Sequence, residues 1–155
     1  MKLLFVDVGN YCRSPVAAAV FLAEMARRGL AQIVAADSAG LEDHHLGQPA
    51  HPMTVQSALR RGIDLSRHRC RRIADADFAG FDRILAVDRQ SLTSLTALCP
   101  PAERHRLGLL LAYAPELSLD DILDPNRQPA EAFERVLDLS ERAAAGLAAA
   151  LNLRP

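Results

Sequence analysis

A short segment near the amino terminus carries the residues best suited to chemistry. These residues are Asp7, Val8, Gly9, Asn10, Tyr11, Cys12, Arg13 and Ser14. Gly9 and Asn10 tolerate positive φ, so the segment can curl and direct several N–H groups inward. Inward N–H groups beside a helix N-terminus bind an anion, and the guanidinium of Arg13 suits a bidentate contact with phosphate. The segment therefore predicts a phosphate-binding loop, with an ordinary strand-to-helix turn as the alternative.

Apolar runs bounded by turn residues predict the strands that would hold this loop. The predicted strands cover Leu3–Val6, Ile33–Ala36, Arg83–Val87 and Leu107–Leu111. Each run is short enough for a strand that is buried on both faces, as in a parallel sheet.

Helices are predicted between these strands. The first begins with Ser14 as N-cap and Pro15 at the first helical position, and it runs through Arg28 to a stop at Gly29. Further helices are predicted over Thr54–Arg61, from an Asp88 N-cap through Leu98, and over Glu131–Leu151.

Strands interleaved with helices predict an α/β domain over residues 1–155, a doubly wound four-stranded parallel sheet with helices on both faces. Such sheets bind ligands beyond the carboxyl ends of their strands. We therefore expect the site to be formed by the loops after Val6, Ala36, Val87 and Leu111.

Composition limits the classes of function. The 155 residues include 18 basic and 19 acidic side chains, giving a net charge of −1, so we expect no nucleic-acid partner. We interpret the basic run 67–72 as a solvated surface segment. No apolar stretch is long enough for a signal peptide or a membrane helix. Three cysteines do not make a disulfide framework, and we expect a cytoplasmic protein.

Several segments together resemble the low-molecular-weight protein tyrosine phosphatases. The matching segments are Gly9-Asn10, Cys12-Arg13-Ser14-Pro15, Asp37-Ser38-Ala39-Gly40 after the predicted second strand, Arg61 to Ser66, Leu85 to Asp88, and Asp124-Pro125. They occur in the family's order and spacing across nearly the whole chain, and the resemblance implies the fold of that family.

The resemblance also implies a reaction, the hydrolysis of phosphomonoesters without metal or cofactor. The loop N–H groups of residues 8–14 and Arg13 would hold the phosphate oxygens, while Asn10, Ser14 and Ser38 would brace the loop. Asp124 would act as the general acid and then activate water. The implied ligands are a phosphorylated protein, a small aryl phosphate, or inorganic phosphate in the loop.

One position departs from the family pattern at its centre. Five residues separate position 7 from Arg13, so the attacking cysteine of the family is expected there, but the chain has Asp7. A carboxylate keeps the negative charge but is a much weaker nucleophile than a thiolate. Cys12 directly precedes Arg13 and corresponds to an oxidation partner in the family. We expect a family member that is catalytically impaired.

Two alternatives remain open for Asp7. It could attack phosphorus itself, but enzymes that form aspartyl phosphates need a metal and normally a lysine. The only lysine is Lys2, at the wrong end of the first strand. Otherwise the chain is a non-catalytic pseudo-phosphatase that binds a phosphoprotein or other partner. A second negative charge about 4 Å from Asp7 would be repelled by a few kcal/mol, which counts against tight binding.

The predicted rim of the pocket is less aromatic than is usual in this family. His44, Asn126 and Arg127 stand where aromatic residues are common, and Tyr11 is the aromatic residue kept near the mouth. Stacking selectivity for phosphotyrosine is therefore expected to be weak. We interpret His44 and His45 as a polar rim, since adjacent histidines in a loop rarely point the same way.

Overall fold

Side chains of the first strand alternate between two apolar layers. In β1 (Lys2–Asp7), Leu3 and Phe5 belong to one buried cluster and Leu4 and Val6 to the other. This alternation follows from the two-residue period of a strand. Both faces of the strand are therefore covered, as a parallel sheet requires. The computed structural model describes residues 1–153; residues 154 and 155, which the predicted domain includes, lie outside this range.

Within the described residues, four strands form one parallel sheet in the order β2-β1-β3-β4. The other strands are β2 (Ala35–Gly40), β3 (Arg83–Ala86) and β4 (Leu107–Leu109). The order of the strands in the sheet differs from their order along the chain. From β1 the chain passes to β2 on one side of it, and then crosses over to β3 on the other side. This arrangement places a ligand crevice at the carboxyl end of β1.

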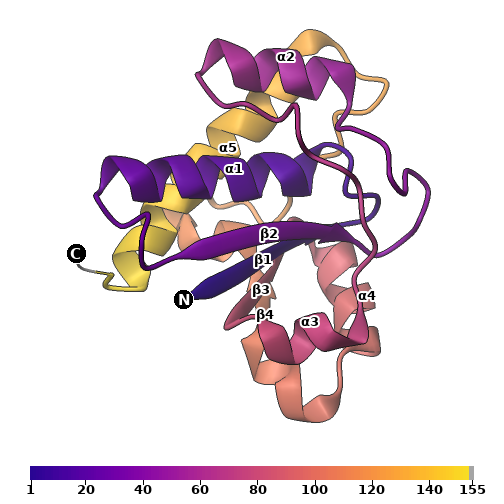
Figure 1. Cartoon of the computed structure of the whole chain (residues 1–155), viewed down its shortest axis with the longest axis vertical. Coiled ribbons are helices and arrows are strands. Elements are labelled where there is room, and N and C mark those ends of the chain that lie inside the picture. Colours follow the sequence, from indigo (N-terminus) through magenta and orange to yellow (C-terminus); the bar gives the residue numbers. More distant parts are fainter. Residues whose placement is uncertain (154–155) are drawn as a thin grey trace.

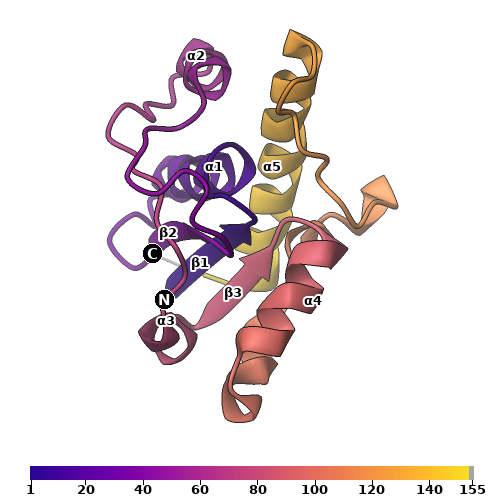
Figure 2. The ribbon, with the colours of Figure 1, turned by 90° about the vertical axis from the view of Figure 1, so that its right-hand side faces the viewer.

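Helices cover both faces of the sheet (Figures 1 and 2). On one face lie α1 (Arg13–Arg27) and α5 (Ala130–Ala150), with α2 (Pro52–Arg60) packed against α5. On the other face lie α3 (Asp75–Gly80) and α4 (Arg89–Leu98). Short 3-10 turns follow at Pro101–Arg106, Leu110–Tyr113 and Pro115–Leu117. The predicted doubly wound fold is confirmed.

The predicted second strand was wrong in its limits. Ile33 is 42% exposed in a turn, whereas the strand begins at Ala35 and continues through the polar Asp37 and Ser38 to Gly40. Register explains the shift, because β2 pairs with β1 from Lys2 opposite Ala35 to Asp7 opposite Gly40. At a sheet edge, polar side chains can remain in a strand. The Asp-Ser-Ala-Gly segment therefore lies within β2 rather than after it.

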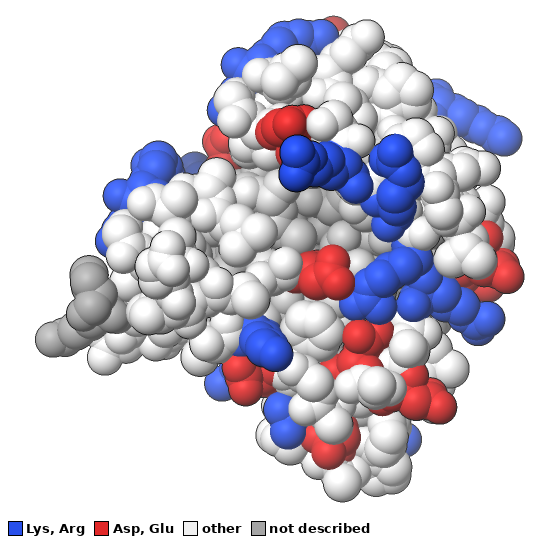
Figure 3. All heavy atoms as spheres, in the orientation of Figure 1, with Lys and Arg blue, Asp and Glu red and all other residues white. Residues whose placement is uncertain are grey.

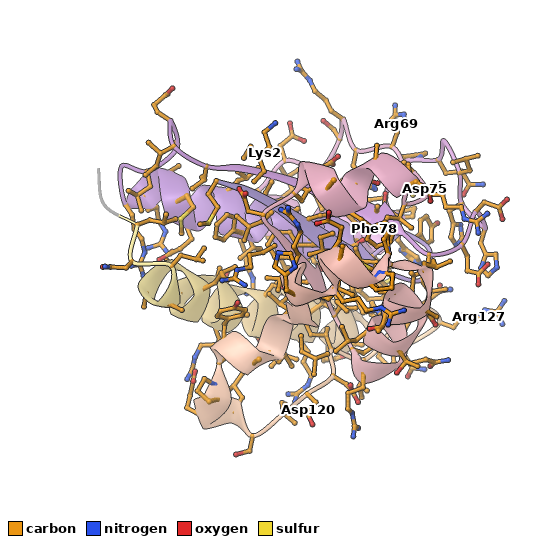
Figure 4. All side chains as sticks on the ribbon, turned by 90° about the horizontal axis from the view of Figure 1, so that it is seen from below. Lys2, Arg69, Asp75, Phe78, Asp120 and Arg127 are labelled. Carbon is orange, nitrogen blue, oxygen red and sulfur yellow. The ribbon has the colours of Figure 1, made fainter. Side chains whose placement is uncertain are left out.

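Other predicted limits also needed correction. Helix α1 begins at Arg13 with Cys12 at the N-cap, so Ser14 does not cap it. The fourth strand ends at Leu109, where a 3-10 turn begins. Helix α3 was not predicted, since its single buried residue, Phe78, gives no apolar period. Figure 4 shows Phe78 directed from α3 toward the sheet.

Charges of both signs are interspersed on the face of the molecule shown in Figure 3. Arg61, for example, pairs with Glu134, Asp138 and Glu141. Within residues 1–153, no helix has both the length and the apolarity needed to span a bilayer.

Candidate functional site

Asp7 closes the floor of the loop that follows β1. Its side chain is buried, and the residue is only 3% exposed. One carboxylate oxygen, Oδ1, accepts the N–H of Asn10 at 2.6 Å, and the other, Oδ2, accepts the N–H of Ser14 at 2.8 Å. Two N–H groups of residues 7–14 therefore point inward, and both are directed at a carboxylate of the chain itself.

Opposing effects act on the Asp7 carboxyl. Burial is the largest and raises its pKa above the ordinary value. The N–H of Ser14, the guanidinium of Arg13 and the N–H of Asn10 stabilise the charged form, but they do not cancel the cost of burial. Asp7 thus takes up a proton more readily in the folded than in the unfolded chain.

The raised pKa of Asp7 predicts a pH-dependent stability. Between about 3.9, the ordinary value for aspartate, and the higher folded value, the Asp7 contribution weakens folding as pH rises. The unfolding free energy of Asp7→Asn relative to the natural chain should therefore increase with pH across that window, by up to about 1.4 kcal/mol per unit. Urea unfolding at a series of pH values measures this.

Asp64→Asn is the matched control for the pH series. Hydrogen bonds from Ser66 hold the pKa of Asp64 below its ordinary value, so its contribution is present above that value and is lost as pH falls. The two variants should therefore drift in opposite directions relative to the natural chain. Parallel drifts would contradict the assignment for Asp7.

Asn10 braces the loop from within. Its φ of 57° lies in the left-handed region, which asparagine tolerates. Its amide donates to the hydroxyls of Ser14 and Ser38, each at 2.9 Å, and its Oδ1 accepts the N–H of Arg71, also at 2.9 Å. The side chain therefore joins the loop, α1, β2 and the segment before α3, and it fixes the curl that surrounds Asp7.

Removal of this brace should be costly. Asn10→Ala leaves buried hydroxyl and N–H groups without their partner and places alanine at positive φ, so we expect a loss of about 2 kcal/mol in unfolding free energy. Ser38→Ala removes one of the same hydrogen bonds and should cost about 1 kcal/mol. Urea unfolding of both variants tests this order, and equal losses would show that Asn10 acts only through Ser38.

The basic run 67–72 is not simply a solvated surface segment. His68 Nε2 and the thiol of Cys70 both donate to the carbonyl oxygen of Asn10, at 2.8 and 2.9 Å. Arg71 pairs with Asp37 and Asp77, which anchors the segment to β2 and α3. The prediction holds for the exposed Arg67, Arg69 and Arg72, but a run of charges does not reveal that the side chains between them anchor the segment to the loop.

Gly40 lets the loop lie directly on the end of β2. A Cβ at this position would come within 2.9 Å of backbone atoms of Val8, Gly9 and Asn10. Real side chains do not tolerate such contacts, so the backbone approach requires glycine. The last residue of the Asp-Ser-Ala-Gly segment thus shapes the site by having no side chain.

Arg13 enters the site from the first turn of α1. It is 5% exposed, and its NH1 donates to Asp88 Oδ2 at 2.6 Å and to the carbonyl of Ile122 at 2.8 Å. Asp88 also accepts the N–H of Ser91 at 2.7 Å and so caps α4. Burial raises the pKa of Asp88, but the hydrogen bonds from Ser91 and the charge of Arg13 hold it below the ordinary value. The sequence indicated the cap but not this ion pair.

A small pocket of about 130 Å³ opens above the loop. It brings together most of the predicted loop with the rim and the Asp-Pro segment. Its lining residues are Asp7, Val8, Gly9, Tyr11, Cys12, Arg13, His44, His45, Asp124 and Asn126. Asn10, Ser14 and Ser38 lie behind this surface, fully or almost fully buried.

Comparison with known proteins identifies the architecture around this pocket. The family model for the low molecular weight phosphotyrosine protein phosphatases matches residues 2–154. The chain belongs to this family. It is 35% identical over 154 residues to the low molecular weight protein-tyrosine-phosphatase of Streptomyces coelicolor, covering 97% of this chain and 93% of that one.

Solved structures agree with this membership. A protein tyrosine phosphatase from Entamoeba histolytica, with Hepes in the active site, superposes with a TM-score of 0.95 at 31% identity, covering 98% of this chain and 97% of that one. Vibrio vulnificus Wzb in complex with benzylphosphonate superposes with a TM-score of 0.82 at 28% identity, covering 96% and 97%.

The rim of this phosphatase-family pocket is built from stacked rings. Tyr11 and His45 lie face to face with ring centroids 3.8 Å apart and planes 7° from parallel. His51 meets Tyr11 edge-on at 5.2 Å and contacts Phe133 of α5 at 4.9 Å. Burial lowers the pKa of His51, which favours the neutral ring. The ring stack ties the mouth of the pocket to α5.

Asp124 is exposed at the other side of the phosphatase-family pocket. Its carboxylate accepts the N–H of Asn126 at 3.1 Å, and the following Pro125 is buried. Arg127 adopts a φ of 62°, is exposed and does not line the pocket. Figure 4 shows Arg127 at one side of the molecule and Lys2, at the start of β1, well apart from it.

Cys12 lines the pocket but is a poor thiolate. It is 4% exposed, and burial raises its pKa to about 12, although a hydrogen bond from Thr54 opposes the shift. At neutral pH the side chain is therefore a protonated thiol. Burial likewise raises the pKa of Cys70 to about 11.

Proposed function

We propose that this chain binds phosphomonoesters in the loop of residues 7–14 but hydrolyses them poorly, because Asp7 stands in the position of the nucleophilic cysteine. The observation that carries the proposal is the pair of hydrogen bonds from Asn10 and Ser14 to the Asp7 carboxylate. The donors that would stabilise an attacking thiolate are directed at a group that attacks phosphorus weakly.

Cys12, the other cysteine position of the loop, does not take over the role of nucleophile. The thiol of Cys12 is protonated at neutral pH, as its raised pKa requires. Attack by Asp7 would give an acyl phosphate, a route that normally uses a lysine to shield the phosphate charge. Lys2 begins β1, whereas Asp7 ends the same strand, so this lysine cannot assist.

The remaining residues suit the reaction of the family. Arg13 lies where it can hold phosphate oxygens, and Asp124 stands at the mouth, where it can protonate a leaving group. Asn10, Ser14 and Ser38 brace the loop through their hydrogen bonds. The proposed ligands are phosphorylated proteins or small aryl phosphates, and the benzylphosphonate bound by the Vibrio vulnificus relative supports this class.

A non-catalytic binding role is the second candidate. The carboxylate of Asp7 occupies loop donors that a phosphate would use, which favours a pseudo-phosphatase that recognises a partner through its rim of Tyr11, His44 and His45. For either role we propose a reducing cytoplasm, where Cys12, Cys70 and Cys99 stay free as they are in the structure.

The hydrolysis of an aryl phosphate separates these roles. The natural chain and Asp7→Cys are compared at equal concentration over pH 5 to 7. The proposal expects little turnover by the natural chain and a large gain in the cysteine variant. Turnover by the natural chain as fast as that of an active cysteine variant would contradict it, whereas negligible turnover by both folded proteins would favour the pseudo-phosphatase.

A further inference from the structure

Asp7 leaves the pocket with acceptors where an oxyanion site normally has donors. Each of its oxygens takes one backbone N–H from the loop side, through Asn10 and Ser14. A carboxylate has about four acceptor positions, so capacity remains on the side that lines the pocket. When Asp7 is ionised, a ligand oxygen that meets it must therefore bring a hydrogen to share.

The charges around the pocket act in the same direction. Asp7 and Asp124 line it with a single guanidinium, that of Arg13, whose NH1 is already bound to Asp88. The other titratable groups that line it are His44 and His45 from the loop after β2, Tyr11 from the loop after β1, and Cys12 from the start of α1. Behind the loop, Cys70 is also close enough to feel the charge of Asp7. A fully ionised dianion would meet an excess of negative charge.

We propose that Asp7 makes this pocket selective for oxyanions that keep one acidic O–H, such as phosphate and phosphonate monoanions, over sulfate and sulfonate. In the bound state the ligand O–H donates to the Asp7 carboxylate, while Arg13 and the remaining loop N–H groups contact the other oxygens. One proton is shared and no covalent bond changes. This inference rests on the proposed function, because it assigns the ligand class of the same loop.

The acidity of the ligand determines whether it can donate an O–H to Asp7. A phosphomonoester loses its second proton near pH 6, so its monoanion remains accessible near neutrality. A sulfonate has no second proton to offer, so its oxygens face the ionised Asp7 carboxylate as acceptor against acceptor. The lost charge-assisted hydrogen bond corresponds to a roughly 10- to 100-fold weaker complex.

Benzylphosphonate and benzylsulfonate form a matched pair of probes. Isothermal titration calorimetry at pH 6.0, where a large share of the phosphonate keeps its acidic O–H, compares their affinities for the natural chain, Asp7→Ser and Asp120→Asn. We expect the natural chain to prefer the phosphonate by roughly 10- to 100-fold. Asp7→Ser, which frees the loop donors, should bind both ligands with affinities within about threefold. Asp120→Asn removes an exposed carboxylate that does not line the pocket, so it should keep the preference.

The outcomes separate this inference from the proposed function. Equal affinities of both ligands for the natural chain would overturn the inference and leave the phosphate loop intact. Binding of both ligands by Asp7→Ser alone would show that Asp7 only plugs the loop, and this also overturns the inference. If neither ligand bound a folded Asp7→Ser variant, the loop would not be an anion site, and the proposed function would fail as well.

Discussion

Asp7→Cys is expected to hydrolyse an aryl phosphate at least about 1,000-fold faster than the natural chain, since the loss of a nucleophile in other enzymes costs this much or more. The surroundings of residue 7 favour a thiolate. Backbone N–H groups of Asn10 and Ser14 point at its side chain, α1 begins nearby at Arg13, and the guanidinium of Arg13 is close enough to stabilise negative charge. Each of these lowers a thiol pKa. Steady-state release of nitrophenol from p-nitrophenyl phosphate measures the gain.

Two controls define what the gain means. Asp120→Cys makes the same chemical change at an exposed carboxylate, which Figure 4 shows on the outside of its loop, and should leave the rate at that of the natural chain. Adding Asp124→Asn to Asp7→Cys should lower the restored rate by roughly 100-fold, as expected for loss of a general acid. A restored rate that ignores Asp124 would contradict its proposed role.

The sequence predicts this fold well because the fold rests on apolar periodicity. The runs Leu3–Val6 and Arg83–Val87 coincide closely with β1 and β3. Both strands are buried on both faces, so their apolar residues are continuous and predict a strand without knowledge of the strands that pair with them. Strand β2 was misplaced because its position depends on pairing with β1, and its polar Asp37 and Ser38 are tolerated by a sheet edge. Local composition does not determine the register between strands that are far apart in the sequence.

The candidate site likewise has a part that local sequence predicts and a part that depends on long-range contacts. The loop could be predicted from local residue types, because Gly9, Asn10 and Arg13 lie close together in the sequence, just after the first strand. The ion pair of Arg13 with Asp88 and the hydrogen bonds of His68 and Cys70 to Asn10 join residues far apart in the chain. Such contacts depend on the order of strands in the sheet. They decide how firmly the loop is held, whereas the local residues decide what it can bind.

Arg13→Met should lower the unfolding free energy by about 3 kcal/mol, because it leaves a mostly buried carboxylate without its cationic partner. The side chains of Arg13 and Asp88 are only 6% and 16% exposed. By contrast, Arg142→Met breaks an ion pair with Glu116 in which both side chains are half exposed, and it should cost under about 1 kcal/mol. Urea unfolding at pH 7 compares the two.

Asp88 provides the decisive partner for a double-mutant cycle with Arg13. Asp88→Asn keeps an N-cap for α4 but removes the charge, so Arg13→Met combined with Asp88→Asn should be more stable than Arg13→Met alone. The pKa of Asp88 is held below its ordinary value, so the contribution of the pair is present above that value and is lost as pH falls. The difference between the natural chain and Arg13→Met should therefore shrink in acid. If the difference stayed constant down to pH 2, the loss would come from packing of the Arg13 stem rather than from its charge.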